Sequence, residues 1–264
     1  MPLTKISINN FRCFEGLEIS LSPGVNFFYG ANGSGKTSIL EAVFIFSSGK
    51  SFKSSNLTSL IKHNCNNFLL KAYDGKRGYV AEIEKNKNKS ISVLLNNNKI
   101  VTSKLIKEFP CTPIHNNTFS FADASPDFRR KLLDRSIFIA EEEFSRTWFS
   151  YYKALKQRNH TLKNNRISDI YAWNNKLSQD GEMLSKLRNT FFDKTLQEFK
   201  ILLKRLEPNN IFDFFESISI NFSQGWSEEN TLFQSLEKNE QKDLKRKTTT
   251  EGPHKSDIKF LINE

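Results

Sequence analysis

The fold is decided by eight residues near the N-terminus, which read Gly30-Ala31-Asn32-Gly33-Ser34-Gly35-Lys36-Thr37. They match the phosphate-binding pattern G-x-x-x-x-G-K-[ST] at every fixed position. Glycine admits a backbone with positive φ, so the three glycines let the amide N–H groups turn inward as an anion-binding nest. We predict that these eight residues bind ATP, that Lys36 neutralises its β- and γ-phosphates, and that the Thr37 hydroxyl binds Mg²⁺.

The segments on both sides of this loop have the character that a phosphate-binding loop requires. The run Val25-Asn26-Phe27-Phe28-Tyr29 is rich in β-forming residues and predicts a short buried strand. Residues 37–47 are apolar on nearly every side, which predicts a helix buried in a layered fold. Because strand, loop and helix follow in the correct order, a chance glycine-rich turn is the weaker interpretation.

Further strands are predicted before and after the loop. The alternating segments are residues 3–8, 17–21, 68–73, 79–84 and 90–95. The last three follow one another closely and are separated by turn residues, so they predict an antiparallel meander.

A second block of the chain begins at Ser125-Pro126. Serine before proline predicts a helix start, because the hydroxyl caps the helix and proline takes its first position. Helical spacing then continues, with interruptions, to Arg205, and strand-like alternation returns at residues 211–222 and 257–262. We therefore expect three parts: a nucleotide-binding lobe over 1–124, a helical lobe over 125–210, and returning strands over 211–264.

Composition limits the class of protein. The chain has 264 residues, of which 38% are hydrophobic and 26% charged, as in a soluble globular protein. It contains no run of eighteen apolar residues, which excludes a transmembrane helix, and its N-terminus leads directly into a predicted strand, so we expect no signal peptide. The three widely spaced cysteines argue against a disulfide framework and favour the cytoplasm; Cys13, Cys65 and Cys111 are interpreted as small buried hydrophobic residues.

The net charge of +10 is concentrated near the loop. Residues 36–107 hold 13 basic and 4 acidic residues, an excess of nine positive charges that favours a polyanionic partner such as nucleic acid. A general drift toward Lys and Asn explains this excess equally well. If they share one face, the candidates for contact with DNA phosphates are Lys50, Lys53, Lys62, Lys71, Lys76 and Arg77.

Other candidate residues are weaker. Trp148, Phe149, Tyr151 and Tyr152 lie among cations and could stack on bases, but helical spacing favours a core role. His63 and His115 have no spacing that suggests a metal site. The roles of His254 and Lys255 stay open.

Two parts of a complete phosphoryl-transfer site are not found. No four apolar residues are followed by Asp-Asp or Asp-Glu, and residues 212–216 alternate and do not fit. Residues 177–181, Leu-Ser-Gln-Asp-Gly, are a superficial match to a Leu-Ser-Gly-Gly-Gln signature segment, and we interpret them as a solvated helix surface. The sequence motifs therefore identify no catalytic residues.

Several segments resemble a known family. Ile6-Ser7-Ile8-Asn9-Asn10-Phe11-Arg12 together with the glycine-rich loop resembles the N-terminal lobe of SMC-like ATPase heads. Later segments resemble the RecF family of bacterial recombination-mediator ATPases along the whole chain. These segments are residues 21–26, 49–54, 129–134, 155–159 and 252–257.

The resemblance implies an α/β fold of the P-loop ABC/SMC-like head type, with a mixed sheet and a second, mainly helical lobe. It implies a cytoplasmic protein of replication-linked recombinational DNA repair that binds ATP and single-stranded or gapped DNA. It further implies an ATP-dependent homodimer, partners of the RecO and RecR type, help in loading the recombinase, and support of the SOS response after DNA damage. In the family pattern Arg12 lies near the nucleotide phosphates; the alternative is an exposed cation at a strand end.

The chain departs from the family pattern in two places. Residues 114–117, Ile-His-Asn-Asn, stand where relatives have an acidic pair after proline. Relatives also continue past the equivalent of Glu264, into the signature segment and the acidic Mg²⁺-site strand, so we expect that the C-terminal part of the core is missing. The alternative function is therefore a truncated, hydrolysis-deficient fragment that binds nucleotide or DNA. A small-molecule P-loop kinase is weaker, because such kinases place parallel βα units after the loop.

Overall fold

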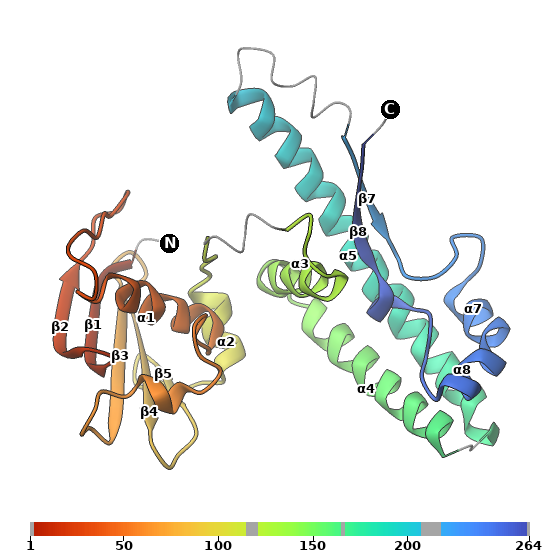
Figure 1. Cartoon of the computed structure of the whole chain (residues 1–264), viewed down its shortest axis with the longest axis horizontal. Coiled ribbons are helices and arrows are strands. Elements are labelled where there is room, and N and C mark those ends of the chain that lie inside the picture. The colour runs from red at the N-terminus through yellow and green to blue at the C-terminus, as the bar shows by residue number, and fades with distance from the viewer. Residues whose placement is uncertain (1–2, 115–120, 165–166, 207–217, 263–264) are drawn as a thin grey trace. The chain divides into compact units, whose positions relative to one another are not determined.

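The computed structural model describes residues 3–114, 121–164, 167–206 and 218–262. The chain divides into two compact units, Met1–Ile114 and His115–Glu264, and each is described by itself (Figure 1). This division differs from the expected boundary at residue 124. It also joins the two segments that were expected to be separate, 125–210 and 211–264, in one unit.

Unit 1 is built on a six-stranded sheet with the order β2-β1-β3-β4-β5-β6. Its strands are β1 (Leu3–Phe11), β2 (Phe14–Ser20), β3 (Asn67–Asp74), β4 (Tyr79–Asn86), β5 (Ser92–Leu95) and β6 (Asn98–Lys99). Every pair of neighbouring strands is antiparallel, which confirms the predicted meander. Alternate residues of β3 are buried, namely Phe68, Leu70, Ala72 and Asp74, so one face of the sheet turns to the core.

One face of this sheet is covered by the helix that follows the glycine-rich loop. Helix α1 (Lys36–Ser48) buries Ile39, Ala42 and Ile45 against the sheet residues, as its apolar composition predicted. A 3₁₀ turn, η1 (Leu57–Leu60), and helix α2 (Thr102–Glu108) complete the layer. The result is a two-layer α/β unit that fixes the start of α1 near the end of β1.

The predicted strand at residues 25–29 is wrong. The segment leaves Val25, Phe27 and Tyr29 exposed by 75%, 85% and 94%, and only Phe28 packs on the core. A strand forms only where a neighbouring strand satisfies its backbone groups, and no described residue pairs with this segment. The strand pairs in the described part of the chain are all antiparallel.

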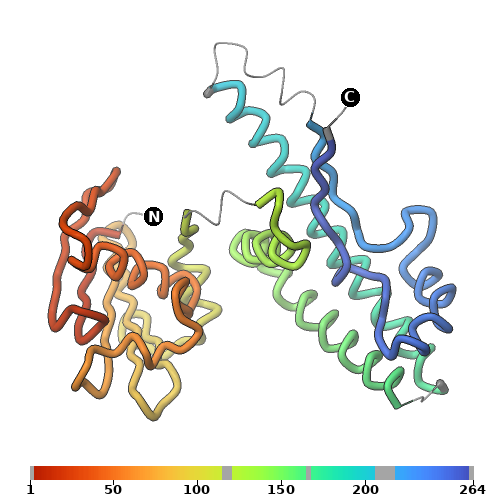
Figure 2. Tube along the Cα trace, in the orientation of Figure 1, coloured from red at the N-terminus to blue at the C-terminus, as the bar shows by residue number. Residues whose placement is uncertain are grey.

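Unit 2 is mainly helical (Figures 1 and 2). Its helices are α3 (Pro126–Ala140), α4 (Phe144–Lys163), α5 (Ile170–Leu206), α7 (Leu232–Lys238) and α8 (Glu240–Arg246), with 3₁₀ turns η3 (Ile167–Asp169) and η4 (Pro253–Lys255). The predicted start at Ser125 is confirmed, since its Oγ accepts a hydrogen bond from the Phe128 N–H and Pro126 opens the helix. Helix α5 is described as far as Leu206, and residues 207–217 lie outside the described part, so the expected end of the helical region stays a prediction.

Two strands lie on these helices. Strand β7 (Ile218–Ser223) pairs antiparallel with β8 (Asp257–Ile262), so the predicted strand at 257–262 is confirmed. The predicted strand at 211–222 is confirmed for residues 218–222, and residues 211–217 lie outside the described part. The strands and α7 share one hydrophobic core with α3, α4 and α5, which explains why residues 121–262 form a single unit.

Two expectations, one about the aromatic residues of α4 and one about residues 177–181 of α5, have different outcomes. Tyr151 is fully buried in the core, and Trp148 and Tyr152 pack against it, so the core interpretation is confirmed for these residues; Phe149 is 64% exposed. Leu177, Ser178 and Gly181 are buried inside unit 2, so the interpretation of 177–181 as a solvated surface is wrong for these three residues. They lie on the side of α5 that packs against the core.

Candidate functional site

The glycine-rich loop has the backbone that a phosphate nest requires. Gly30, Gly33 and Gly35 have φ values of 147°, 84° and 95°. A Cβ at Gly35 would lie 2.3 Å from Cζ of Phe14, so any other residue would have to displace the Phe14 ring and would also be strained by the positive φ. Gly35 is also the N-cap of α1 and provides no side-chain cap, so the first N–H groups of the helix are left for a ligand.

Lys36 lies inside the curve of this loop. Its Nζ donates hydrogen bonds of 2.8 Å to the carbonyl oxygens of Gly30 and Ala31. An ammonium group has three donors, so one remains for an anion. Lys36 is therefore fixed at the N-terminus of α1, where the helix dipole also favours negative charge.

A cavity of about 540 Å³ opens on this loop. Its lining residues are Arg12, Cys13, Asn32, Gly33, Gly35, Lys36, Thr37, Ser38, Lys53, Ser59 and Ile61. Lys36 and Thr37 of the loop thus share one cavity with the predicted residue Arg12. Three residues of the loop do not line the cavity, namely Gly30, Ala31 and Ser34. None of the described lining residues is acidic, so the cavity favours an anion.

Arg12 reaches this cavity from the turn between β1 and β2, where its φ is 53°. Its guanidinium binds the Glu41 carboxylate of α1 through Nε and Nη2, both at 2.9 Å. These hydrogen bonds raise the pKa of Arg12 above its ordinary value, although partial burial opposes the shift. Arg12 is therefore a held group at the cavity wall and not an exposed cation at a strand end.

Sequence reasoning assigned no role to Glu41, Ser51 or Ser59, and its interpretation of the cysteines was incorrect. Cys13 is exposed and lines the cavity, while Cys65 and Cys111 are half-buried, so the interpretation of all three as buried residues is wrong. Cys13 lies in the β1–β2 turn at the end of the sheet, beside Gly35, and turns of this kind lie at the protein surface. A single acidic residue within an apolar helix was the available signal for Glu41.

The six candidate DNA contacts do not share one face. Lys53 lines the cavity, and Lys62 follows the lining residue Ile61, with its Nζ 3.3 Å from Oε2 of Glu15. Lys76 and Arg77 follow Asp74, which pairs with Leu3 at the opposite end of β1. Lys50 is exposed at the C-terminal end of α1 and Lys71 pairs with Glu82.

Arg77 has a structural role. It binds Asp74 at 2.7 Å and Glu108 at 2.8 Å, and its guanidinium lies over the rings of Tyr79 and Phe109. These contacts join the β3–β4 turn to the end of α2. A guanidinium held in this way has little capacity left for phosphate, so Arg77 is removed from the candidate DNA contacts.

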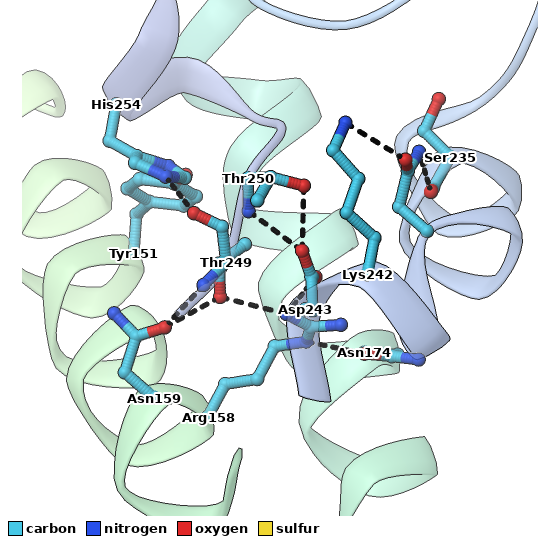
Figure 3. A network of polar contacts seen from close by, with 11 residues as sticks. Tyr151, Arg158, Asn159, Asn174, Ser235, Lys242, Asp243, Thr249, Thr250 and His254 are labelled. Carbon is cyan, nitrogen blue, oxygen red and sulfur yellow. Dashed lines mark hydrogen bonds and ion pairs between the residues drawn. The ribbon is translucent and has the colours of Figure 1, made fainter. Parts of the chain in front are cut away.

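In unit 2, a buried polar network explains the family-like segment that contains His254 (Figure 3). Arg158 of α4 is fully buried and binds Asp243 of α8 at 2.7 Å and Thr249 Oγ1 at 2.8 Å. The Thr250 N–H and hydroxyl donate to the other oxygen of Asp243. The network thus fastens the chain after α8 onto α4.

His254 is a structural member of this network. The His254 ring lies between the Tyr151 hydroxyl, 2.7 Å from Nδ1, and the Thr249 carbonyl oxygen, 3.0 Å from Nε2. Because only a nitrogen that carries hydrogen can donate to the carbonyl, Nε2 is protonated and Nδ1 accepts from Tyr151. Burial lowers the pKa of His254 to about 4, and the nearby charges of Lys255 and Arg130 act in the same direction.

This pKa predicts a loss of stability in mild acid. The unfolded chain binds a proton at His254 as the pH falls below its ordinary value of 6.5, whereas the folded chain does so only near pH 4. The contribution of His254 to stability is therefore fully present above pH 6.5, declines as the pH falls from 6.5 to 4, and is lost below pH 4. At pH 4.5 we expect a loss of about 2 kcal/mol relative to pH 7 from this residue.

Urea unfolding of the wild type and of His254→Gln at both pH values measures this contribution. The variant removes the titrating group, so its stability should fall less between pH 7 and pH 4.5 than that of the wild type. Equal losses in the two proteins would contradict the assignment.

No other part of the described chain suggests a metal site or a membrane span. Among the residues that the structure describes, no three His, Cys, Asp or Glu side chains gather as metal ligands. The described helices include none that is both long and apolar enough to cross a membrane.

Comparison with known proteins places the chain in a family. A family model described as an AAA ATPase domain matches residues 1–261. The DNA replication and repair protein RecF of Pseudoalteromonas translucida is 33% identical over 272 residues, which cover 99% of this chain and 72% of the relative. The RecF protein of Shewanella denitrificans is 30% identical over 266 residues, with coverage of 99% and 72%.

The fold agrees with this assignment. A solved structure of the recombination mediator protein RecF-ATPrS in the RecFOR pathway matches 99% of this chain and 74% of that chain, with 24% identity and a TM-score of 0.84. A second structure, RecF-ATP, matches 99% and 73% with a TM-score of 0.82. The expected fold class of a P-loop ATPase head is thereby confirmed, and the chain belongs to the RecF family of DNA replication and repair proteins.

Proposed function

We propose that this chain binds ATP with Mg²⁺ at residues 30–37. The observation that carries the proposal is the cavity at the uncapped start of α1, which joins the Lys36 ammonium, the Thr37 hydroxyl and the Arg12 guanidinium. Thr37 would hold the Mg²⁺ ion together with the phosphates. The ion supplies neutralisation of phosphate charge when bound, and Lys36 and the loop N–H groups bind and orient the phosphates.

The exposed thiol of Cys13 provides a direct test. Because Cys13 lines the cavity beside Gly35, bound Mg·ATP should block its access to a maleimide reagent. We expect saturating Mg·ATP to slow the labelling of Cys13 at least about tenfold, by occupying the cavity. Peptide mass spectrometry would follow Cys13 and Cys65 in the same sample.

Cys65 does not line the cavity and is the internal control, so its labelling rate should not change. Equal labelling of Cys13 with and without Mg·ATP would argue against nucleotide binding in this cavity.

The wider role follows from the family. We propose that ATP acts as a switch that closes a homodimer on single-stranded or gapped DNA in the cytoplasm, with partners of the RecO and RecR type. In this role the protein would help load the recombinase during replication-linked repair and support the SOS response. The names of the relatives, DNA replication and repair protein RecF and the RecFOR pathway, support this proposal.

A second candidate function is nucleotide and DNA binding without appreciable hydrolysis. It is favoured by the chemistry of the cavity, because no described lining residue carries a carboxylate that could hold the Mg²⁺ water. Glu41 is close to the cavity but is already bound to Arg12. DNA-stimulated ATP hydrolysis that disappears in Lys36→Met would exclude this second candidate.

Lys62, next to the cavity-lining residue Ile61, is our candidate for DNA contact. In saturating Mg·ATP, Lys62→Gln should lower the slope of log Kobs against log salt by about 0.7 for single-stranded DNA, because one phosphate contact is lost. The matched control is Lys71→Gln, which also removes a lysine from an ion pair but lies away from the cavity and should keep the slope. Equal slopes in the two variants would contradict this placement.

A further inference from the structure

Two cations reach the nucleotide cavity from separate segments of unit 1. Arg12 comes from the β1–β2 turn, and Lys53 comes from the loop that follows α1. Neither side chain belongs to the glycine-rich loop itself. Something other than that loop must therefore fix their positions around the phosphates.

The contacts converge on one carboxylate. Both Glu41 oxygens accept from Arg12, Oε2 from Nε and Oε1 from Nη2, at 2.9 Å each. Oε1 also accepts a hydrogen bond from the Ser51 hydroxyl. The Ser51 Oγ in turn accepts from the backbone N–H groups of Lys53 at 2.9 Å and Ser54 at 3.0 Å.

Burial makes this arrangement specific. Glu41 has no exposed surface, and a buried carboxylate is stable only when it is paired and hydrogen-bonded. Burial alone would raise the pKa of Glu41, but the hydrogen bonds from Arg12 and Ser51 and the charges of Arg12 and Lys53 lower it below its ordinary value. The carboxylate therefore stays ionised and holds both partners.

Arg12 keeps donors for a ligand. A guanidinium has five N–H donors, and two of the Arg12 donors bind Glu41. No described residue accepts from the remaining three, and Arg12 lines the cavity. The Arg12 plane is thus fixed on one side while its other edge is available to phosphate oxygens.

We propose that Glu41 is a positioning residue for nucleotide binding, which holds Arg12 directly and Lys53 through Ser51. Its carboxylate does not touch the nucleotide. It pre-organises the Arg12 guanidinium and, through Ser51, the backbone that carries Lys53, so that these groups need not be ordered when the phosphates arrive. This inference rests on the proposed binding of ATP in the cavity.

A double-mutant cycle tests the proposal with Mg·ATP as the probe. We expect Arg12→Ala and Glu41→Gln each to weaken Mg·ATP binding by about tenfold. Because Glu41 acts through Arg12, the Kd of the double variant for Mg·ATP should lie within threefold of the Kd of the single variant that binds less tightly. The same pattern is expected for Ser51→Ala with Lys53→Ala. Losses that multiply to about 100-fold in the Arg12/Glu41 cycle would overturn the proposal.

A matched control separates positioning from a general effect on unit 1. Glu108→Gln makes the same chemical change in another arginine pair, that with Arg77, and Glu108 does not line the cavity. We expect its affinity for Mg·ATP to stay within twofold of the wild type, and a loss equal to that of Glu41→Gln would overturn the proposal. If Glu41→Gln does not fold, the Ser51/Lys53 cycle decides, since Ser51→Ala leaves the Arg12–Glu41 pair intact.

The outcome also distinguishes this inference from the proposed function. If the wild type does not bind Mg·ATP, or if Lys36→Met binds it equally well, both the function and the positioning role fail. If Lys36→Met loses binding while the effects of Arg12→Ala and Glu41→Gln multiply, the proposed function stands and the positioning role alone fails.

Discussion

Replacement of Lys36 by methionine is expected to weaken Mg·ATP binding by about 100-fold. Hydrogen bonds to charged groups contribute about 1.5–3 kcal/mol each, and the Lys36 ammonium is already placed within the loop by two carbonyl oxygens at 2.8 Å. Methionine keeps the unbranched apolar stem of the side chain and removes only the charge and the donors. Titration calorimetry of the 264-residue chain with Mg·ATP would measure the change.

Lys104→Met is the control for this experiment. Lys104 is exposed on α2 of the same unit and does not line the cavity, so its replacement removes a charge without touching the site. We expect its affinity to match that of the wild type, and both variants to unfold at the wild-type temperature. Unchanged affinity in Lys36→Met would remove the assignment of this cavity to ATP.

The parts of the fold that could be predicted depend on short-range rules. The glycine-rich loop requires positive φ at positions 30, 33 and 35, and the structure has it at all three. The cap at Ser125 and the proline after it also act within four residues. For such features, the residue type and its spacing contain the physical cause.

The failures depend on partners that are distant in the sequence. Val25, Phe27 and Tyr29 have the pattern of a strand, but pairing requires a neighbour that no local pattern reveals. Arg12 and Glu41 are 29 positions apart and meet only because the β1–β2 turn lies over the start of α1. Arg77 was assigned to DNA from its charge, whereas its partners on β3 and α2 assign it to the fold.

Unit 2 gives the clearest example of this limit. Arginines from three helices converge on the segment that follows α8. Arg188 of α5 binds the Pro253 carbonyl oxygen at 2.6 Å, and Arg129 of α3 binds Asp257 at 2.8 Å. Arg158 of α4 binds Thr249, as described above. Helical periodicity places an arginine on a helix face, but the backbone or side-chain oxygen that it binds is known only from the folded chain.

The Arg158–Asp243 pair should make the largest single contribution to the stability of unit 2. Both side chains have no exposed surface. Arg158→Met should lower the free energy of unfolding by at least about 3 kcal/mol, because Asp243 would stay buried without its positive partner. Urea unfolding at pH 7 measures this loss. The control is Lys176→Met in the Lys176–Asp180 pair, where the lysine side chain is 50% exposed and the expected change is within about 0.5 kcal/mol.

The double variant Arg158→Met/Asp243→Asn identifies the cause of this loss. Asparagine keeps an oxygen for the Thr250 N–H and hydroxyl but carries no charge, so the buried charge that Arg158→Met leaves unpaired is removed. We expect the double variant to recover at least about 1 kcal/mol relative to Arg158→Met, since replacing a whole buried pair costs less than breaking it. Should the double variant be less stable than Arg158→Met, packing and hydrogen bonding of the two side chains would account for the loss, and not the unpaired charge.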